Sequence, residues 1–379
     1  MRSTADVVII GAGVVGASIA WHLTEMGCRN VVLLERESQP GTGSTSKSMG
    51  GVRAQFALEA DIRMSLFSIP FFRDFARITG QPSGYRAQGY LFLATNERQM
   101  DALRVNVAQQ RNTGLDAVRL VTTQEALAMV PQLETADILG GSFCPTDGFV
   151  DPHSVTTGFL RAALDRGAEL LRETEVTGLE VDGRGVAGVR TSQGSIASRI
   201  VVNAAGPWAK EIAAMAGIDL PVVPLRRTLV PTERFDKVSH DAPMTVDLST
   251  GFHFRPEGLG FLFAWADPED ATNGAFIEKI LNHAARRVPA FAEVQVNPSR
   301  AWSGFYEMTP DHHPILGRSP VEGFYLANGF SGHGVMHSPA TGKILADLIL
   351  TGRTELIDAG IFDYGRFAEG RMIHEGGIL

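Results

Sequence analysis

The chain has 379 residues, with 42 acidic and 34 basic side chains and a formal net charge of −8. This balance argues against a surface that binds nucleic acid or anionic membranes, because both attract cations. Two cysteines, Cys28 and Cys144, are too few for a disulfide framework or a structural zinc site. No run of 18 uncharged apolar residues predicts a membrane span. We therefore expect a cytoplasmic protein with no bound metal ion, long enough for two domains.

The first predicted unit is a nucleotide-binding βαβ fold at residues 6–35. Val7–Ile10 is a short apolar run typical of a buried parallel strand. A helix is expected over Val14–Met26, with Gly27 as its stop, and Val31–Leu34 is the second strand. This order of strand, helix and strand favours a dinucleotide cofactor over an ordinary glycine-rich turn.

Three glycines and one acid in this unit have separate roles. Gly11 permits a tight turn out of the strand, Gly13 lets the backbone approach a pyrophosphate, and Gly16 lets helix and strand pack closely. The helix N-terminus favours phosphate through its N–H groups and dipole. Glu35, nineteen residues after Gly16, can accept hydrogen bonds from both hydroxyls of a ribose.

A long polar loop and two helical patterns come next. Pro40–Gly51 is rich in Gly, Ser and Thr, so its hydroxyl and N–H groups are suited to lining a phosphate or ring. Helices are predicted over Ile62–Ile78 and Glu97–Thr113, with Tyr90–Ala94 as a strand between them. A turn and then a helix are expected from residue 147 to residue 167.

The middle of the chain predicts a β-meander. Strands are expected over Val176–Val181, Val186–Thr191 and Ser195–Ile200, joined by short Gly-containing turns. A meander here suits a two-nucleotide FAD fold more than a plain nicotinamide fold. The buried strand at Ile200–Trp208 ends in small residues, so a ligand or backbone must lie close to it.

Two further patterns follow. Phe252–Arg255 and Gly260–Trp265 predict a hairpin around a turn at Pro256–Gly258, with Phe252 and Phe254 on one face. The glycine-rich loop Gly329–His337 is expected to precede a helix capped by Ser338, with Pro339 in its first turn and Gly352 at its end. A helix N-terminus there would stabilise negative charge on a reduced flavin.

With these motifs in place, the chain resembles the D-amino-acid-oxidase-like FAD oxidoreductases over essentially its full length. It is similar to sarcosine oxidases and to the β subunits of sarcosine oxidase and proline dehydrogenase. The resemblance is carried by five stretches: Gly11–Gly16 with Glu35, Ser44–Phe56, Asn203–Trp208, Trp302–Gly317 and Gly329–Pro339. The last two are specific to this branch of the family.

The resemblance implies an α/β fold in which a Rossmann-like FAD-binding domain of the glutathione-reductase type, with the β-meander, is interleaved with an α+β substrate domain. The substrate domain is expected to be built on a mostly antiparallel sheet. We assign residues 1–84, 145–220 and 300–379 to the FAD-binding domain. Residues 85–144 and 221–299 are assigned to the substrate domain.

The resemblance and the motifs together imply a set of residues that bind FAD. They come from both ends and from the middle of the chain. The set is Gly11, Gly13, Val15, Gly16, Glu35, Arg36, Ser44, Thr45, Ser46, Lys47, Gly50, Gly51, Val176, Ala204, Ala205, Gly206, Trp208, Gly304, Gly332, His333, Gly334, Val335 and Met336.

Five residues are candidates for chemistry at the substrate. The family role of anchoring a substrate carboxylate falls on Arg53, because a guanidinium presents a planar fork to a carboxylate. The alternative is a surface arginine paired with an acid at residue 59 or 61. His333 either faces the flavin or is held by a backbone carbonyl. His253 and Tyr306 either line the substrate face or only pack, and Lys47 either activates oxygen or contacts the FAD pyrophosphate.

The sequence departs from the family pattern at three places. Gly304 stands where monomeric sarcosine oxidase has a cysteine that tethers the flavin, so we expect FAD to be bound without a covalent link. Cys144 is the residual candidate for a tether, with no motif to support it. Met336 replaces a second carboxylate-binding lysine. The hairpin over residues 252–265 lacks the lysine that activates oxygen in that enzyme.

The implied reaction is oxidation of the C–N bond of a small secondary amino acid, such as sarcosine, another N-methyl amino acid or proline. Hydride transfer to flavin N5 gives an imine, and reoxidation by oxygen gives hydrogen peroxide. One alternative is a dehydrogenase subunit that passes electrons to a partner protein. Another is a flavin-bound assembly protein without turnover. Oxidase activity is expected to depend on Lys47, or on His253 or His333 when protonated.

Overall fold

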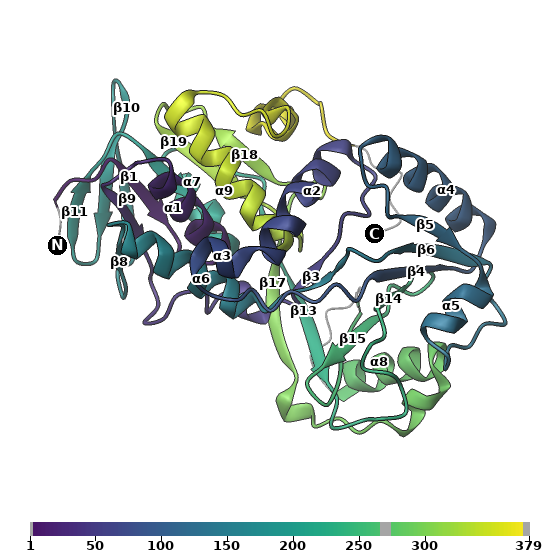
Figure 1. Cartoon of the computed structure of the whole chain (residues 1–379). Coiled ribbons are helices and arrows are strands. Elements are labelled where there is room, and N and C mark those ends of the chain that lie inside the picture. The colour runs from purple at the N-terminus through teal and green to yellow at the C-terminus, as the bar shows by residue number, and fades with distance from the viewer. Residues whose placement is uncertain (1–2, 266–273, 374–379) are drawn as a thin grey trace.

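Two large sheets dominate the computed structural model, which describes residues 3–265 and 274–373. In Figure 1 the sheet that contains β1 (Val7–Ile10) lies on the side of the N-terminus. The sheet that contains β4 (Tyr90–Ala94), β5 (Arg119–Val121) and β6 (Gly140–Cys144) lies on the opposite side. The strands β13 (Val223–Pro231) and β17 (Trp302–Met308) run side by side at the edge of the second sheet that is nearer to the first sheet. Residues from both regions come together at the candidate site.

The first sheet is mainly parallel, and β1 lies near its centre. Its strand order is β18 (Ile315–Arg318), β19 (Phe324–Asn328), β12 (Val201–Asn203), β1 (Val7–Ile10), β2 (Val31–Leu34) and β8 (Glu169–Leu171). Only the pair β18–β19 is antiparallel. All four residues of β1 and of β2 are buried, which explains their continuous apolar sequences.

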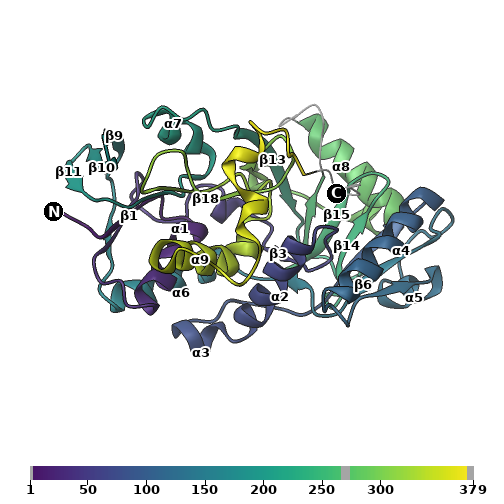
Figure 2. The ribbon, with the colours of Figure 1, turned by 90° about the horizontal axis from the view of Figure 1, so that it is seen from above.

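Helices cover one face of this sheet and the meander covers the other. The helices α1 (Val14–Glu25), α6 (Pro152–Asp165) and α9 (Gly334–Thr351) pack together beside it, as Figure 2 shows from above. Val7 and Ile9 point into that helical core, whereas Val8 and Ile10 join the core with the meander and α7 (Ala209–Ala214). This alternation follows from the two-residue period of a strand.

The second sheet has eight strands and is antiparallel except for the pair β14–β4. Its order is β17 (Trp302–Met308), β13 (Val223–Pro231), β16 (Gly260–Ala264), β15 (His253–Glu257), β14 (Met244–Asp247), β4 (Tyr90–Ala94), β6 (Gly140–Cys144) and β5 (Arg119–Val121). An aromatic core packs one face against α5 (Thr123–Met129) and α8 (Gly274–Arg287). The other face packs against α4 (Glu97–Asn112).

Short elements complete the fold. The strands β3 (Gly51–Val52) and β7 (Gly148–Phe149) form a two-stranded ladder beside the eight-stranded sheet. The 3-10 helices are η1 (Thr45–Lys47), η2 (Gly206–Trp208), η3 (Pro289–Glu293), η4 (Pro298–Arg300), η5 (Ala359–Phe362) and η6 (Tyr364–Arg366). Among the helices of the described residues, none is long and apolar enough to cross a membrane.

The predicted α/β fold class is confirmed. The meander forms as β9 (Val176–Asp182), β10 (Gly185–Thr191) and β11 (Gly194–Ala197), all antiparallel. The strand predicted at residues 90–94 is confirmed with the same bounds, and the mostly antiparallel second sheet is present. The proposed domain boundaries stay a prediction.

The predicted start of the last helix is wrong. We expected Ser338 to cap it, but α9 begins at Gly334, with His333 as its N-cap and Pro339 inside it. Proline lacks the N–H that would bond to the Val335 carbonyl, four residues earlier. The Ser338 hydroxyl donates to that carbonyl instead, at 2.8 Å, so the helix continues through the proline. It ends at Gly352 in the left-handed conformation, as predicted.

Two other boundaries differ from the prediction. The hairpin turn is at Gly258–Leu259, two residues later than expected, because Glu257 still pairs with Gly260. The helix expected over Ile62–Ile78 is divided into α2 (Glu59–Arg73) and α3 (Phe75–Thr79). The division follows Pro70, which removes one helical N–H and favours an early end to the helix.

Candidate active site

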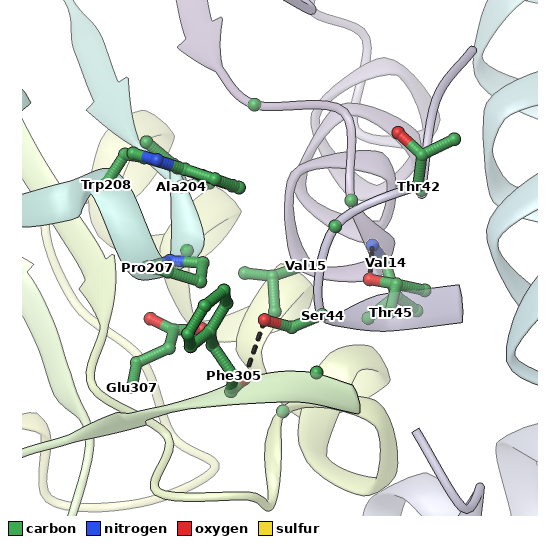
Figure 3. A pocket seen from close by; sticks show the side chains of 18 of the residues that line it. Val14, Val15, Thr42, Ser44, Thr45, Ala204, Pro207, Trp208, Phe305 and Glu307 are labelled. Carbon is green, nitrogen blue, oxygen red and sulfur yellow. Dashed lines mark hydrogen bonds between the residues drawn. The ribbon is translucent and has the colours of Figure 1, made fainter. Parts of the chain in front are cut away.

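A pocket of about 560 Å³ lies where the glycine loops meet the ribbon of β13 and β17 (Figure 3). Most of the residues predicted to bind FAD line it, although they come from segments far apart in the sequence. These are Gly11, Gly13, Val15, Glu35, Arg36, Ser44, Thr45, Lys47, Val176, Ala204, Ala205, Gly206, Trp208, Gly304, Gly332, Gly334 and Val335, together with Tyr306.

At one end of the pocket, the N-terminus of α1 is open. Its N-cap is Gly13, which has no side chain to cap the helix. The Val14 N–H donates to Thr45 Oγ1 at 3.1 Å, and the Ala12 N–H donates to Glu35 Oε2, also at 3.1 Å. The second bond fixes the carboxylate of Glu35 at the end of β2, beside the helix N-terminus. Together these groups can bind a phosphate and the hydroxyls of a ribose.

The other glycines of the motif act through close packing. A Cβ atom at Gly11 would lie 2.4 Å from the Ala204 carbonyl oxygen, and Gly11 has a positive φ of 103°. A Cβ atom at Gly16 would lie 2.0 Å from the Gly11 carbonyl oxygen. Gly16 does not line the pocket, so its part is to allow the helix to approach the strand.

Several other predicted residues also lie outside the pocket lining. Ser46 is exposed and donates to the Thr42 carbonyl at 3.2 Å, within its own loop. A Cβ atom at Gly50 would meet the Val150 carbonyl oxygen at 2.3 Å, so this glycine serves packing. The same is true of Gly51, whose Cβ would lie 2.5 Å from the Tyr90 hydroxyl. Met336 is buried in α9.

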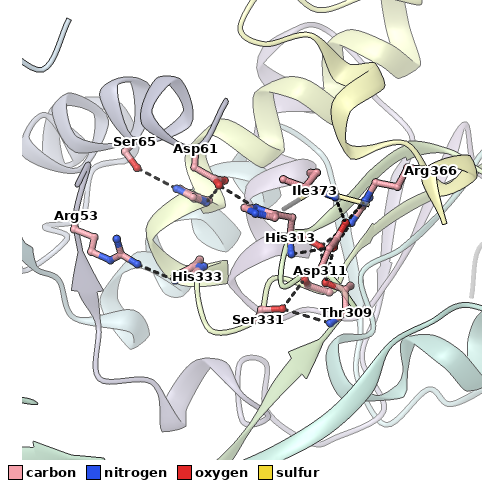
Figure 4. A network of polar contacts seen from close by, with 12 residues as sticks. Arg53, Asp61, Ser65, Thr309, Asp311, His313, Ser331, His333, Arg366 and Ile373 are labelled. Atoms are coloured by element: carbon pink, nitrogen blue, oxygen red, sulfur yellow. Dashed lines mark hydrogen bonds and ion pairs between the residues drawn. The ribbon is translucent and has the colours of Figure 1, made fainter. Parts of the chain in front are cut away.

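Arg53 is buried, with 8% of its surface exposed, and it does not pair with the acid at residue 59, which binds Arg63. Its guanidinium donates to the Gln55 carbonyl and lies 3.8 Å from the centre of the Phe56 ring. Its Nη2 lies 3.3 Å from His333 Nε2 (Figure 4). We call Arg53, Phe56 and His333 the Arg53 cluster.

The Arg53 cluster adjoins the pocket through its histidine. Gly332 and Gly334, on either side of His333, both line the pocket. Burial and the positive charge of Arg53 lower the pKa of His333 well below its usual value, so the ring is neutral at pH 7. Its Nε2 can therefore accept a hydrogen bond from Arg53.

Tyr306 and His253 lie within electrostatic range of Arg53, and of these two only Tyr306 lines the pocket. Tyr306 on β17 packs against Gly332 and keeps 37% of its surface exposed; the partial loss of contact with solvent raises its pKa despite the opposing charges of Arg227 and Arg53. His253 Nδ1 lies 2.9 Å from the Gly251 carbonyl, and burial lowers its pKa. The hypothesis that His253 or His333 acts as a protonated cation is therefore disfavoured on physical grounds.

A buried polar group lies behind the cluster (Figure 4). Asp61 Oδ2 is 3.1 Å from His313 Nδ1, and His337 Nε2 is 3.0 Å from the Ser65 hydroxyl. These contacts link α2 to α9 and to the loop after β17. His312 is exposed, so the adjacent histidines 312 and 313 do not converge. Within residues 3–265 and 274–373, no group of three or more His, Cys, Asp or Glu is arranged to hold a metal ion.

Sequence reasoning missed five charged residues that line the pocket, namely Glu37, Glu175, Glu211, Arg227 and Glu307, and the last two lie on the ribbon of β13 and β17. Glu307 on β17 accepts a hydrogen bond from the Gly329 N–H at 2.9 Å, and burial raises its pKa to about 7. Arg227 on β13 stands opposite Gly304 in the strand register and lies 5.9 Å from the centre of the Tyr306 ring. Neither position carries a motif. Only the pairing of β13 with β17 brings them to the pocket.

Lys47 and Gly304 are close neighbours. A Cβ atom at Gly304 would lie 2.5 Å from Lys47 Cβ, so a cysteine at this position would require Lys47 to move. Cys144 is buried on β6 and does not line the pocket, and burial raises the pKa of its thiol to about 12. His22 is buried in α1 among aromatic rings. Neither Cys144 nor His22 lines the pocket, and Gly304 has no side chain that could attack the flavin.

The described residues fit an FAD molecule. An acid stands beside an open helix N-terminus at one end, and α9 presents a second N-terminus, with no side-chain cap, at Gly334. Apolar walls come from Val15, Val176 and Leu229. This set matches an adenosine, a pyrophosphate and a ring that becomes anionic on reduction.

Comparisons with known proteins agree with this geometry. The profile of the family described as "FAD dependent oxidoreductase" matches residues 6–348. The chain is 32% identical to "FAD-dependent oxidoreductase domain-containing protein 1" of Xenopus laevis, over 99% of this chain and 85% of that protein. It is 31% identical to the mitochondrial sarcosine dehydrogenase of Homo sapiens, over 97% of this chain but only 42% of that enzyme.

Among solved structures, L-proline dehydrogenase from P. horikoshii superposes with a TM-score of 0.90 at 31% identity. The match covers 98% of this chain and 99% of that one. The whole fold, including both sheets, is therefore shared with that enzyme, whereas the chain spans less than half the length of sarcosine dehydrogenase.

Proposed function

Because the chain belongs to the family of FAD-dependent oxidoreductases, we propose that it oxidises the C–N bond of a small secondary or N-methyl amino acid to an imine. Sarcosine and proline are the substrates named for two of its relatives. The observation that carries the proposal is the buried Arg53 cluster beside the cofactor pocket. A guanidinium there suits a ligand with a carboxylate.

In this proposal, bound FAD supplies the hydride acceptor and the protein supplies binding and orientation. Glu35 and the N-terminus of α1 would hold the nucleotide end, and residues 332–335 would line the part of the pocket that takes the ring. Arg53 binds the substrate carboxylate through its planar fork, which fixes orientation as well as charge. The contacts to Phe56 and His333 restrict the guanidinium before the substrate arrives, so less freedom is lost on binding.

Tyr306 and His253 complete the wall of this site. Both are neutral at pH 7, since the pKa of the tyrosine is raised and that of the histidine is lowered. A neutral wall favours the uncharged amine, which is the form that can lose a hydride. Met336 is buried and uncharged, so Arg53 carries the binding of the carboxylate without the second cation of related enzymes.

For reoxidation we infer that oxygen is the acceptor, with hydrogen peroxide as the product. Oxygen gains negative charge when it is reduced, so a nearby cation speeds the step. Lys47 and Arg227 are the cations among the described residues that line the pocket on either side of Gly304. The second candidate is transfer of electrons to a partner protein, which the neutral state of His253 and His333 favours.

An anaerobic reduction screen tests the substrate proposal. The purified protein with FAD is mixed with N-methyl amino acids, proline and primary amino acids, and loss of the oxidised flavin absorbance is followed. We expect bleaching with a secondary or N-methyl amino acid. A flavin that stays oxidised with every amine would support a flavin-bound protein without turnover instead.

We propose that FAD is held without a covalent link, because neither Gly304, Cys144 nor His22 presents a nucleophile to the pocket. Acid precipitation should release the yellow flavin into the supernatant. Colour that stays in the washed, denatured pellet would contradict this expectation.

A further inference from the structure

A buried carboxylate stands behind Arg53. Asp147 has no exposed surface, and it lies in the turn between β6 and β7. In the antiparallel ladder of β3 and β7, Gly51 faces Phe149 and Val52 faces Gly148. The next step of that register places Asp147 opposite Arg53.

The carboxylate of Asp147 binds the two residues that follow Arg53. Its Oδ1 accepts from the Ala54 N–H at 2.9 Å, and its Oδ2 accepts from Gln55 Nε2 at 3.0 Å. The Gln55 carbonyl is the oxygen to which the Arg53 guanidinium donates. Asp147 therefore holds the main chain that carries Arg53 and also the acceptor that orients its side chain.

Gln55 extends this arrangement into the eight-stranded sheet. Its Nε2 also donates to the Tyr90 carbonyl at 3.0 Å on β4, and its Oε1 accepts from the Ser142 hydroxyl at 2.7 Å on β6. Gln55 and Ser142 are both buried, at 5% and 2% exposure. Every polar atom of the Gln55 amide thus has a partner, and its orientation is fixed by that pattern.

We propose that Asp147 is a positioning residue for the carboxylate anchor, acting on Arg53 through the Ala54–Gln55 segment. The proposal rests on the proposed role of Arg53. The carboxylate fixes the Ala54 N–H and the side-chain amide of Gln55. Because the Arg53 guanidinium donates to the Gln55 carbonyl, its position depends on the same segment. Burial raises the pKa of Asp147 to about 6, so at pH 7.5 it is the ionised acceptor that both bonds require.

The isosteric variant Asp147→Asn breaks this pattern. An asparagine keeps one oxygen for the Ala54 N–H, but its NH₂ group then faces the NH₂ group of Gln55. If Gln55 turned its amide over, its Oε1 would face the Tyr90 carbonyl and that bond would be lost, and the Ser142 hydroxyl would become an acceptor whose own proton lacks its present partner. The variant therefore leaves at least one buried donor unmatched, and the Arg53 segment is less well fixed.

The test measures acetate binding to the FAD-loaded protein at pH 7.5, by the change in the flavin absorption spectrum. Four proteins are compared: wild type, Asp147→Asn, Arg53→Ala and the double variant. We expect about tenfold weaker acetate binding in Asp147→Asn. In the Arg53→Ala background, Asp147→Asn should cause no further loss, because the effect passes through Arg53.

The sign of the effect separates positioning from simple electrostatics. Removing a negative charge near Arg53 would by itself strengthen acetate binding. Tighter binding in Asp147→Asn, or equal losses with and without Arg53, would overturn the proposal. If Arg53→Ala leaves acetate binding unchanged, the proposed role of Arg53 fails instead, so the two failures are distinguishable.

Two further variants test whether weaker acetate binding reflects a general loss of stability. Asp247→Asn removes a buried carboxylate of the same sheet, one that pairs with Arg287 at 2.8 Å, and it should leave acetate binding within about twofold of wild type. Ser142→Ala removes one bond to Gln55 and should weaken acetate binding in the same direction as Asp147→Asn, by less. A loss in Asp247→Asn equal to that in Asp147→Asn would contradict a specific role.

Discussion

The cofactor pocket and the Arg53 cluster are neighbours built in opposite ways. The pocket presents main-chain groups: glycines without Cβ atoms and the open N-termini of α1 and α9. The Arg53 cluster presents side chains that contact one another, and Arg53 also donates to the carbonyl of Gln55, two residues away. Substitutions that add atoms should therefore impair the pocket, whereas substitutions that remove side-chain atoms should impair the Arg53 cluster.

The largest effect is expected in the main-chain region, from Gly13→Leu. A Cβ at this position would already lie 3.2 Å from Thr45 Oγ1, and a longer side chain would enter the space for the pyrophosphate. Because the leucine side chain would occupy the space for the pyrophosphate itself, FAD binding should be lost and not only weakened. Isothermal titration of the apo-protein measures it. Gly183→Leu, in an open turn, is the control and should bind FAD normally.

The next largest effect is expected in the Arg53 cluster, from Arg53→Ala. Loss of one partner of a buried charge pair costs about 2–5 kcal/mol, so kcat/KM for amino-acid substrates should fall about 30-fold or more while FAD stays bound. Arg53→Lys should recover part of the loss, because the charge returns without the fork. Arg63→Ala, at an exposed pair on α2, should leave the kinetics unchanged. Unchanged kinetics in Arg53→Ala would place the anchor elsewhere.

A third prediction concerns which side chain supplies the positive charge that speeds reoxidation by oxygen. Lys47 lines the pocket, whereas His253 and His333 belong to the neighbouring wall and are neutral. Stopped-flow reoxidation by oxygen should slow about tenfold in Lys47→Met, as one cation is lost. The pH profile of the reoxidation rate in the wild-type protein should contain no step between pH 6.5 and 8.5 that is absent in His333→Gln. Fast reoxidation in Lys47→Met would remove this lysine and leave Arg227 as the cation to test.

The smallest effect concerns Glu307, the acid in the main-chain region. Its pKa is raised to about 7, so it is neutral below that pH and negative above it. FAD is an anion, so its affinity should decrease as pH rises through 7, by at most about tenfold per pH unit for a single proton. Fluorescence titrations from pH 6 to 8.5 measure this trend. Glu307→Gln should flatten it, and an unchanged slope would assign the titration to another group.

A site built from main-chain groups can be predicted from the sequence, because the glycine spacing and the helix starts that form it fall within about 30 residues of one another. The Gly11–Glu35 unit, the meander and the second glycine loop were therefore predictable. The start of α9 was not, since a serine hydroxyl replaces the missing proline N–H only in the folded helix.

The side-chain site has no such local pattern. Asp147 and Gln55 are 92 residues apart, and nothing in either segment indicates that they bond. Arg227 and Glu307 reach the pocket only through the register of β13 and β17. Arg53 was found through a family resemblance, not through its own neighbours. Long-range register and buried polar bonds are three-dimensional facts that a single sequence does not encode locally.

The position of β1 has a consequence for synthesis of the chain. Among the strands of the described residues, β1 is synthesised first, yet one of its two neighbours in the sheet is β12, which begins at residue 201. The following neighbour, β19, begins at residue 324. The nascent nucleotide-binding unit therefore carries an unpaired apolar strand edge until more than half of the chain is made. Such long sequence separation slows folding and leaves the edge open to aggregation, so chaperone capture of the nascent chain should raise the yield of folded protein.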